Sequence, residues 1–99
     1  MPFARSPLGG SLRDSVRRAE IEIMRYLLAH QDARDTAEGI EKWWLPQSER
    51  FGIADVAAAL HDLEERYLIR VWQSASAKPI YGWGALDRGV FEEYLLSLE

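Results

Sequence analysis

Histidines and paired carboxylates are the side chains of this sequence that could act in catalysis. His30 and His61 fall near the end of one predicted helix and within another, without the spacing of a histidine metal site. The adjacent glutamates at 64–65 and at 92–93 diverge around their helices, so neither pair forms a catalytic dyad. The chain has no cysteine and therefore no thiol nucleophile or thiolate ligand. We predict a protein that binds rather than catalyses, with no metal and no cofactor.

Basic side chains are the next candidates, because neutralising phosphates supplies most of the affinity of proteins for nucleic acid. The net charge is −4, and residues 35–69 are the most acidic part, with eight acidic residues against three basic ones. Basic residues gather instead near the N-terminus and on a predicted hairpin, residues 68–84, that contains no acidic residue. The candidates for nucleic-acid binding are Arg13, Arg17, Arg18, Arg66, Arg70 and Lys78.

Aromatic residues suggest a different partner. Four tryptophans in 99 residues are many for a small core, and aromatic residues are enriched at protein interfaces. The strand alternation places Trp72 on the same face as Arg70, which is the solvent face if Ile69 and Val71 point to the core. The candidates for a protein interface are Trp43, Trp44, Trp72, Phe91, Tyr94 and Leu98.

The spacing of apolar residues predicts the elements that carry these side chains. Residues 1–10 have no periodicity and are expected to form a flexible arm, and residues 11–99 a single domain. Apolar residues recur every three or four positions over 12–31 and over 53–67, which predicts two helices with buried faces. Between them, Asp35 and Glu38 match a capping box at the start of a short helix that Pro46 ends.

The last third of the chain predicts a hairpin followed by a helix. Residues 68–72 are rich in β-branched and aromatic types, and a turn of small residues separates them from a second strand at 80–83. Asp87 is expected to cap a C-terminal helix, with Leu86 packing on Phe91 as a hydrophobic staple.

This order of elements resembles the winged helix-turn-helix superfamily. Residues 56–69 are similar to its pattern V-x-x-A-L-x-x-L-x-x-x-G-L-[IV], with Tyr67 where many relatives have glycine. The resemblance covers about residues 12–98. It implies an α+β, mostly α fold with a three-helix core, a two-stranded β-hairpin wing and a C-terminal helix. Members of the superfamily bind DNA or other proteins.

Charge argues against DNA reading by the third helix. Residues 53–67 carry four acidic residues against Arg66 alone, a local charge of −3, which a phosphate backbone repels. Two hypotheses of equal weight stay open. One is a transcription-related domain that contacts DNA through its wing and basic N-terminal region. The other is an acidic protein–protein adaptor that does not bind DNA.

The remaining expectations concern oligomeric state, location and small ligands. The C-terminal helix could pair with a second copy, which would give a homodimer. The sequence has no signal peptide and no apolar run of the length that spans a membrane, so we expect a cytoplasmic protein. Sensing of a small molecule has no convergent polar set to support it.

Overall fold

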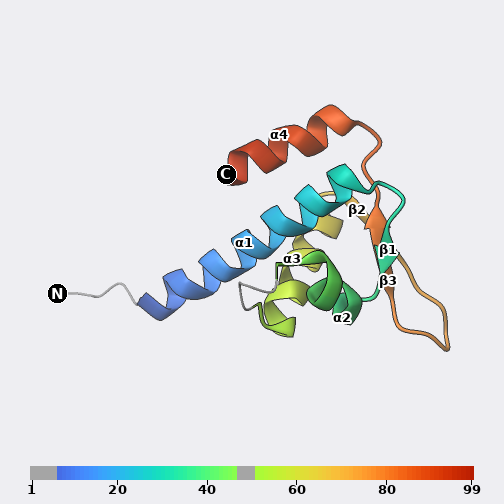
Figure 1. Cartoon of the computed structure of the whole chain (residues 1–99), viewed down its shortest axis with the longest axis horizontal. Helices are drawn as coiled ribbons and strands as arrows, with labels where there is room; N and C mark the ends of the chain where they lie inside the picture. Colours follow the sequence, from blue (N-terminus) through green and yellow to red (C-terminus); the bar gives the residue numbers. More distant parts are fainter. Residues whose placement is uncertain (1–6, 47–50) are drawn as a thin grey trace.

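The computed structural model describes residues 7–46 and 51–99, with the side chains of the first helix described from Asp14 onward. Within these residues the chain forms a mostly helical α+β structure with a three-stranded antiparallel sheet (Figure 1). The elements are α1 (Pro7–Ala29), β1 (Arg34–Asp35), α2 (Ala37–Gly39), η1 (Ile40–Trp44), α3 (Ile53–Glu65), β2 (Ile69–Trp72), β3 (Ile80–Trp83) and α4 (Arg88–Leu98). The layout is compatible with a winged helix. None of the helices in the described ranges combines the length and apolar character needed to cross a bilayer.

The long helix α1 forms the centre of the fold and packs on α3. Its predicted apolar stripe is confirmed, because Ala19, Ile23, Met24 and Leu27 are fully buried. The helix begins at Pro7, where the fixed φ of proline suits a first helical position. Residues 7–10 of the predicted arm therefore belong to the helix, and residues 1–6 lie outside the described residues.

The segment after α1 differs from its prediction at the cap. Thr36, not Asp35, caps α2, because its hydroxyl accepts a hydrogen bond from the backbone N–H of Gly39 at 3.1 Å. The chain then continues into the wider π-helical turn η1, whose two tryptophans differ in exposure. Trp44 is buried and stacks on Tyr26 at 4.7 Å, whereas Trp43 is 68% exposed.

The predicted hairpin is confirmed, and the structure adds a third strand to it. The strand order is β1-β3-β2, with β1 pairing antiparallel with β3 over two residues. Ile69 is buried against the helices and Arg70 is exposed, as the alternation predicts, whereas Val71 and Trp72 are both half-buried. One face of the sheet therefore closes the core and the other faces solvent.

The connection from α3 to β2 contains the one described non-glycine residue with a positive φ. Tyr67 has a φ of 62°, in the left-handed region that glycine adopts most easily. The N–H of Leu68 donates to the carbonyl of Leu63, and the N–H of Tyr67 to that of Glu64, which is the Schellman arrangement. The left-handed residue ends the helix even though it is a tyrosine.

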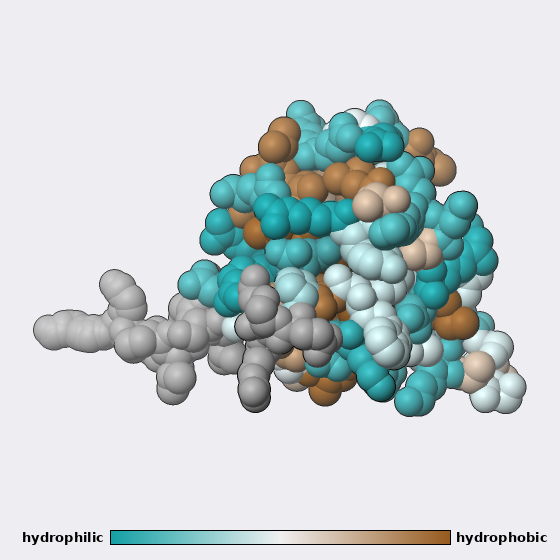
Figure 2. Space-filling model, viewed as in Figure 1, coloured by the Kyte–Doolittle hydropathy of each residue, from teal (hydrophilic) through white to brown (hydrophobic). Residues whose placement is uncertain are grey.

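The last helix, α4, packs across α1. Asp87 caps it as predicted, accepting a hydrogen bond from the N–H of Gly89 at 2.8 Å. The predicted staple is wrong, because Leu86 is fully exposed and Phe91 instead stacks on Trp83 at 4.3 Å. Figure 2 shows hydrophobic residues in the seam between α4 and α1, below the hydrophilic surface of α4.

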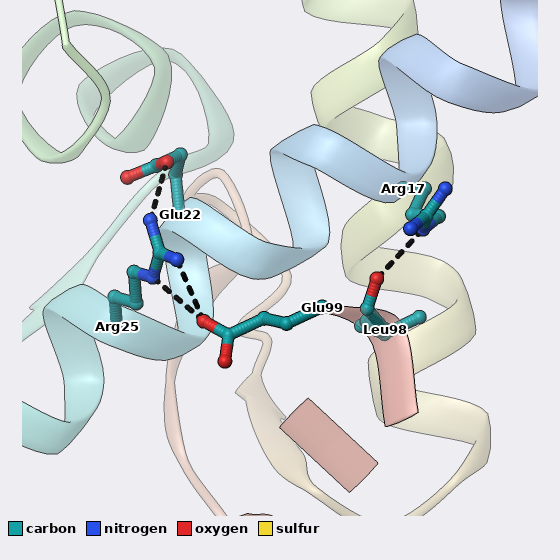
Figure 3. A network of polar contacts seen from close by, with 5 residues as sticks. All are labelled: Arg17, Glu22, Arg25, Leu98 and Glu99. Carbon is teal, nitrogen blue, oxygen red and sulfur yellow. Dashed lines mark hydrogen bonds and ion pairs between the residues drawn. The ribbon is translucent and has the colours of Figure 1, made fainter. Parts of the chain in front are cut away.

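Polar contacts fasten the C-terminal end of α4 to α1 (Figure 3). Arg17 donates from Nε to the main-chain oxygen of Leu98 at 2.8 Å. Arg25 bonds the carboxylate of Glu99 through two nitrogens, at 2.7 and 3.0 Å, and that of Glu22 at 3.2 Å. These contacts lie at the surface, so the main stabilisation of α4 comes from the residues buried beneath it.

Candidate nucleic-acid interface

The outer face of α3 carries small side chains. Its exposed residues are Ile53, Ala54, Ala57, Ala58, His61 and Glu65. Two of the acidic residues expected to repel DNA are withdrawn from this face: Asp55 is half-buried, and Asp62 points toward α1 and α4, where it bonds Tyr94. The face is less acidic than the sequence suggests. It still lacks the arginine, lysine, asparagine and glutamine side chains that read bases.

The solvent face of the sheet carries a different set of residues. The strand register aligns Arg34 of β1 with Gly82 of β3, and Gly82 with Arg70 of β2. Trp72 lies two residues along β2 from Arg70 and therefore on the same face. The sheet thus brings together two arginines and a tryptophan from two strands at opposite edges.

Both arginines lie against the same indole ring. The Cζ atom of Arg34 is 4.3 Å from the ring centroid of Trp72, and that of Arg70 is 5.8 Å away. Both distances are within the range of cation–π attraction, worth about 0.5–1 kcal/mol at exposed sites. The ring therefore restricts where the two guanidinium groups can lie.

Gly82 makes this arrangement possible. A Cβ atom at this position would lie 2.9 Å from the carbonyl oxygen of Ala33, 3.1 Å from Cγ of Arg34 and 3.2 Å from Cζ3 of Trp72. The absent side chain leaves room for Arg34 to cross the middle strand and reach the tryptophan. A larger residue here would push the two side chains apart.

Within the described part of the chain, the two arginines of this face have no carboxylate partner, whereas the nearby Lys78 has one. Among the described residues, neither Arg34 nor Arg70 forms an ion pair with a carboxylate. Lys78, in the hairpin loop, lies 3.5 Å from Glu38, and both side chains are more than half exposed. Beside the loop is an open hollow of about 230 Å³, lined by Trp72, Gln73, Ser74, Ala77, Lys78 and Ile80. The face can therefore offer fixed positive charge and neutral hydrogen-bond donors to an anion.

The structure separates the other basic candidates from this face. Arg66 is paired with Asp62 at 3.0 Å, and Arg17 is used at the end of α4. Arg18 is exposed, with its Cζ 5.5 Å from the ring of Phe51. Arg13 lies in α1, and its side chain is outside the described part. Because the start of α1 and the hairpin loop lie at opposite ends of the molecule (Figure 1), the basic N-terminal region and the wing do not form one surface.

The residues proposed for a protein interface are also dispersed. Trp44 and Phe91 are in the core, at 7% and 0% exposure, and are not available at the surface. Tyr94 and Leu98 are half-buried in the contact of α4 with the rest of the chain. Trp43 is exposed with Nζ of Lys42 at 5.1 Å from its ring. Of the six residues, Trp72 alone belongs to the sheet face described above.

Arg34 is the residue of this face that sequence reasoning missed. It lies between two helices in a strand of two residues, which is too short to leave an alternation pattern. Its partner across the sheet is Gly82, far along the chain. The fold alone brings it beside Arg70.

Comparison of the chain with known protein families, with curated proteins and with solved structures finds no match. Within the described ranges, no group of three or more metal-binding side chains is close enough together to hold an ion.

Proposed function

We propose that the chain is a winged-helix domain that binds nucleic acid through the solvent face of its sheet and its wing, the hairpin of β2 and β3. The observation that carries the proposal is the pair of unpaired arginines, Arg34 and Arg70, held on the ring of Trp72. Guanidinium groups bind phosphate through two parallel hydrogen bonds. Because neither arginine is paired with a carboxylate in the described part of the chain, no ion pair there has to be broken before a phosphate can bind.

The binding proposed here is to the backbone of nucleic acid, with little reading of sequence. Affinity would come from Arg34, Arg70 and Lys78, with Ser74 and Gln73 as neutral donors beside them. The outer face of α3 offers alanines where base contacts would be made. A role in transcription would then depend on a partner or on DNA shape for its specificity.

Salt dependence of binding to a duplex of mixed sequence tests this proposal. The logarithm of affinity falls with the logarithm of salt by about 0.9 for each phosphate neutralised. We expect a slope corresponding to two or three phosphates, reduced by about one unit in Arg34→Ala and again in Arg70→Ala. Fluorescence anisotropy of a labelled duplex, from about 50 to 200 mM salt, measures both the slope and the affinity.

Arg88→Ala is the matched control, because Arg88 is an exposed arginine on α4 that is paired with Glu92 at 2.9 Å. This variant should bind the duplex with nearly the affinity and slope of the unchanged chain. Absence of binding at about 50 mM salt, where phosphate contacts are strong, contradicts the proposal. So does an equal loss of affinity in the Arg88 and Arg34 variants.

A second candidate function, binding of a protein partner, is favoured by a different surface. Two hollows, of about 400 and 190 Å³, share Tyr67 and Leu86 in their walls. These two side chains are 83% and 100% exposed, and Tyr67 has the strained left-handed backbone described above. Strain of this kind is most often found at functional positions. Two results together would favour this alternative: the unchanged chain does not bind DNA, and the Leu86→Ser variant loses a protein partner that the unchanged chain binds.

A further inference from the structure

A group of polar side chains around the buried Glu20 joins α4 to α1 and α3, away from the sheet face. Glu20 of α1 is 4% exposed and is the one buried charged residue of the described part. The hydroxyl of Tyr94 on α4 donates a hydrogen bond to Oε1 of Glu20, at 3.0 Å. The hydroxyl oxygen of Tyr94 also lies 3.3 Å from Oδ2 of Asp62 on α3. The carboxyl groups of Glu20 and Asp62 therefore meet at this hydroxyl, and a hydrogen bond between them contributes to the pKa of each. We call these three residues the Glu20–Asp62–Tyr94 cluster.

The hydrogen bonds of the cluster require a shared proton. The hydroxyl of Tyr94 has one proton to donate, and two ionised carboxylates have none. The bond between Glu20 and Asp62 therefore needs a proton on one of the two carboxyl groups. Two ionised carboxylates in contact in a buried site would instead repel each other.

Arg66 indicates which carboxyl group holds the proton. Its Nε donates to Oδ2 of Asp62 at 3.0 Å, and its Cζ lies 4.3 Å from the ring centroid of Tyr94. Burial raises the pKa of Asp62, but its hydrogen bonds with Glu20 and Arg66 outweigh burial and lower that pKa overall. Burial and the neighbouring Asp62 raise the pKa of Glu20 to about 8. Glu20 is therefore the protonated partner and Asp62 the ionised one.

We propose that this buried proton controls the docking of α4, so that its loss from Glu20 loosens the helix while α1 and α3 stay packed together. The charged and titratable groups that face Glu20 are Asp62 and Arg66 from α3 and Tyr94 from α4. Of these, Tyr94 belongs to α4, the helix whose docking depends on the proton. Removal of the proton leaves a charged carboxylate buried at the contact with α4. Burial is the largest cause of the raised pKa of Glu20 and outweighs the hydrogen bond from Tyr94, which favours the ionised form. Detachment of α4 lets water reach that charge.

The sign of the pH dependence follows from the shifted pKa of Glu20. When α4 is detached, water reaches Glu20 and its pKa falls from about 8 toward the ordinary 4.5, although Asp62 of α3 still raises it. Between the pKa of the detached form and about 8, the docked form binds up to one proton more than the detached form. Within that window the docking equilibrium falls about tenfold for each unit that pH rises, and above it the equilibrium is constant. Acidification fastens α4 and alkaline conditions loosen it.

Trp83 reports on α4 because its ring stacks on Phe91, with the ring centroids 4.3 Å apart. The whole chain, labelled with 5-fluorotryptophan, can be followed by ¹⁹F NMR from about pH 5 to pH 9. Trp83→Phe assigns the resonance of Trp83 among the four tryptophans. We expect this resonance to shift or broaden as pH rises toward 8, while the resonance of Trp44, in the contact of η1 with α1, stays in place.

Glu20→Gln is the decisive variant, because a neutral amide can replace the protonated acid as donor to Asp62 and as acceptor from Tyr94. It should abolish the pH dependence of the Trp83 resonance, and Asp62→Asn should move the transition to lower pH. Glu93→Gln, which changes an exposed carboxylate on α4, should leave the transition unchanged. A Trp83 resonance that does not respond to pH, or that responds equally in the unchanged chain and in Glu20→Gln, overturns the proposal. If Glu20→Gln fails to fold, the direction of the shift in Asp62→Asn decides in the same way.

Discussion

Truncation of Phe91 is the sharpest test of how α4 is held in the fold. The side chain is fully buried and stacks on Trp83 with the ring planes 25° apart. Replacing a buried phenylalanine by alanine costs about 3–5 kcal/mol, and the lost ring contact is worth about 0.5–1.5 kcal/mol of that. A domain of this size has an unfolding free energy of about 5–15 kcal/mol. Phe91→Ala should therefore remove a large part of the stability of the chain.

Urea unfolding followed by circular dichroism at pH 6 measures this effect. With a slope of about 1–3 kcal/mol per molar urea, we expect the midpoint of Phe91→Ala to fall by about 2 M. Leu96→Ala is the matched control, because Leu96 lies on the same helix at 71% exposure. Its unfolding free energy should change by less than about 0.5 kcal/mol. A loss of under about 1 kcal/mol in Phe91→Ala would show that α4 does not pack on the core as described.

Three further substitutions test the local geometry through the same unfolding midpoint. Gly84→Ala should lose about 1–3 kcal/mol, because its Cβ would lie 2.5 Å from a backbone carbon of β2; Gly52→Ala, with no atom nearer than 3.9 Å, should be tolerated. Trp44→Ala should cost about 3–5 kcal/mol, whereas Trp43→Ala, at 68% exposure, should cost under about 1 kcal/mol; equal costs would contradict the orientation of η1. Tyr67→Gly should raise stability slightly. The left-handed backbone costs a non-glycine residue about 1–2 kcal/mol, whereas the added flexibility of glycine in the unfolded chain costs only about 0.5–1 kcal/mol. A clear loss of stability would mean that the tyrosine side chain itself stabilises the fold.

Helices and hairpin were predictable because they repeat a pattern. The stripe of α1 and the buried face of α3 recur at helical spacing, and both are buried as predicted. The alternation of β2 placed Arg70 and Trp72 on the solvent face. Arg70 is exposed as predicted, whereas Trp72 is half-buried, with Arg34 and Arg70 over its ring. The single polar residue Asp87 was sufficient to locate the start of α4.

Features that depend on a single residue or on distant pairing were not predictable. The cap of α2 moved from Asp35 to Thr36, since either side chain can accept the hydrogen bond and the backbone decides between them. Leu86 was expected to pack on Phe91, but the ring of Trp83 occupies that position. The second error comes from a local rule that a tertiary contact overrides.

Part of the candidate site could be predicted from the sequence. Arg70, Trp72 and Lys78 were identified from their place on the hairpin, whereas Arg34 joins them only through a two-residue strand. The net charge of α3 follows from the sequence, but a net charge does not show in which direction each acidic side chain points. Asp62 turns inward to Arg66 and Tyr94, so its charge is not presented to a ligand at the outer face of α3.

The most direct test of the central claim is to map where nucleic acid touches the chain. A ¹⁵N-labelled sample titrated with a short duplex of mixed sequence, at low salt, reports the change in each backbone amide resonance. We predict that the largest changes fall on Arg34, Arg70, Gly82 and the hairpin loop between β2 and β3, and that they disappear in the Arg34→Ala, Arg70→Ala double variant. Changes confined to the outer face of α3, or no changes at all, would contradict binding through the sheet face.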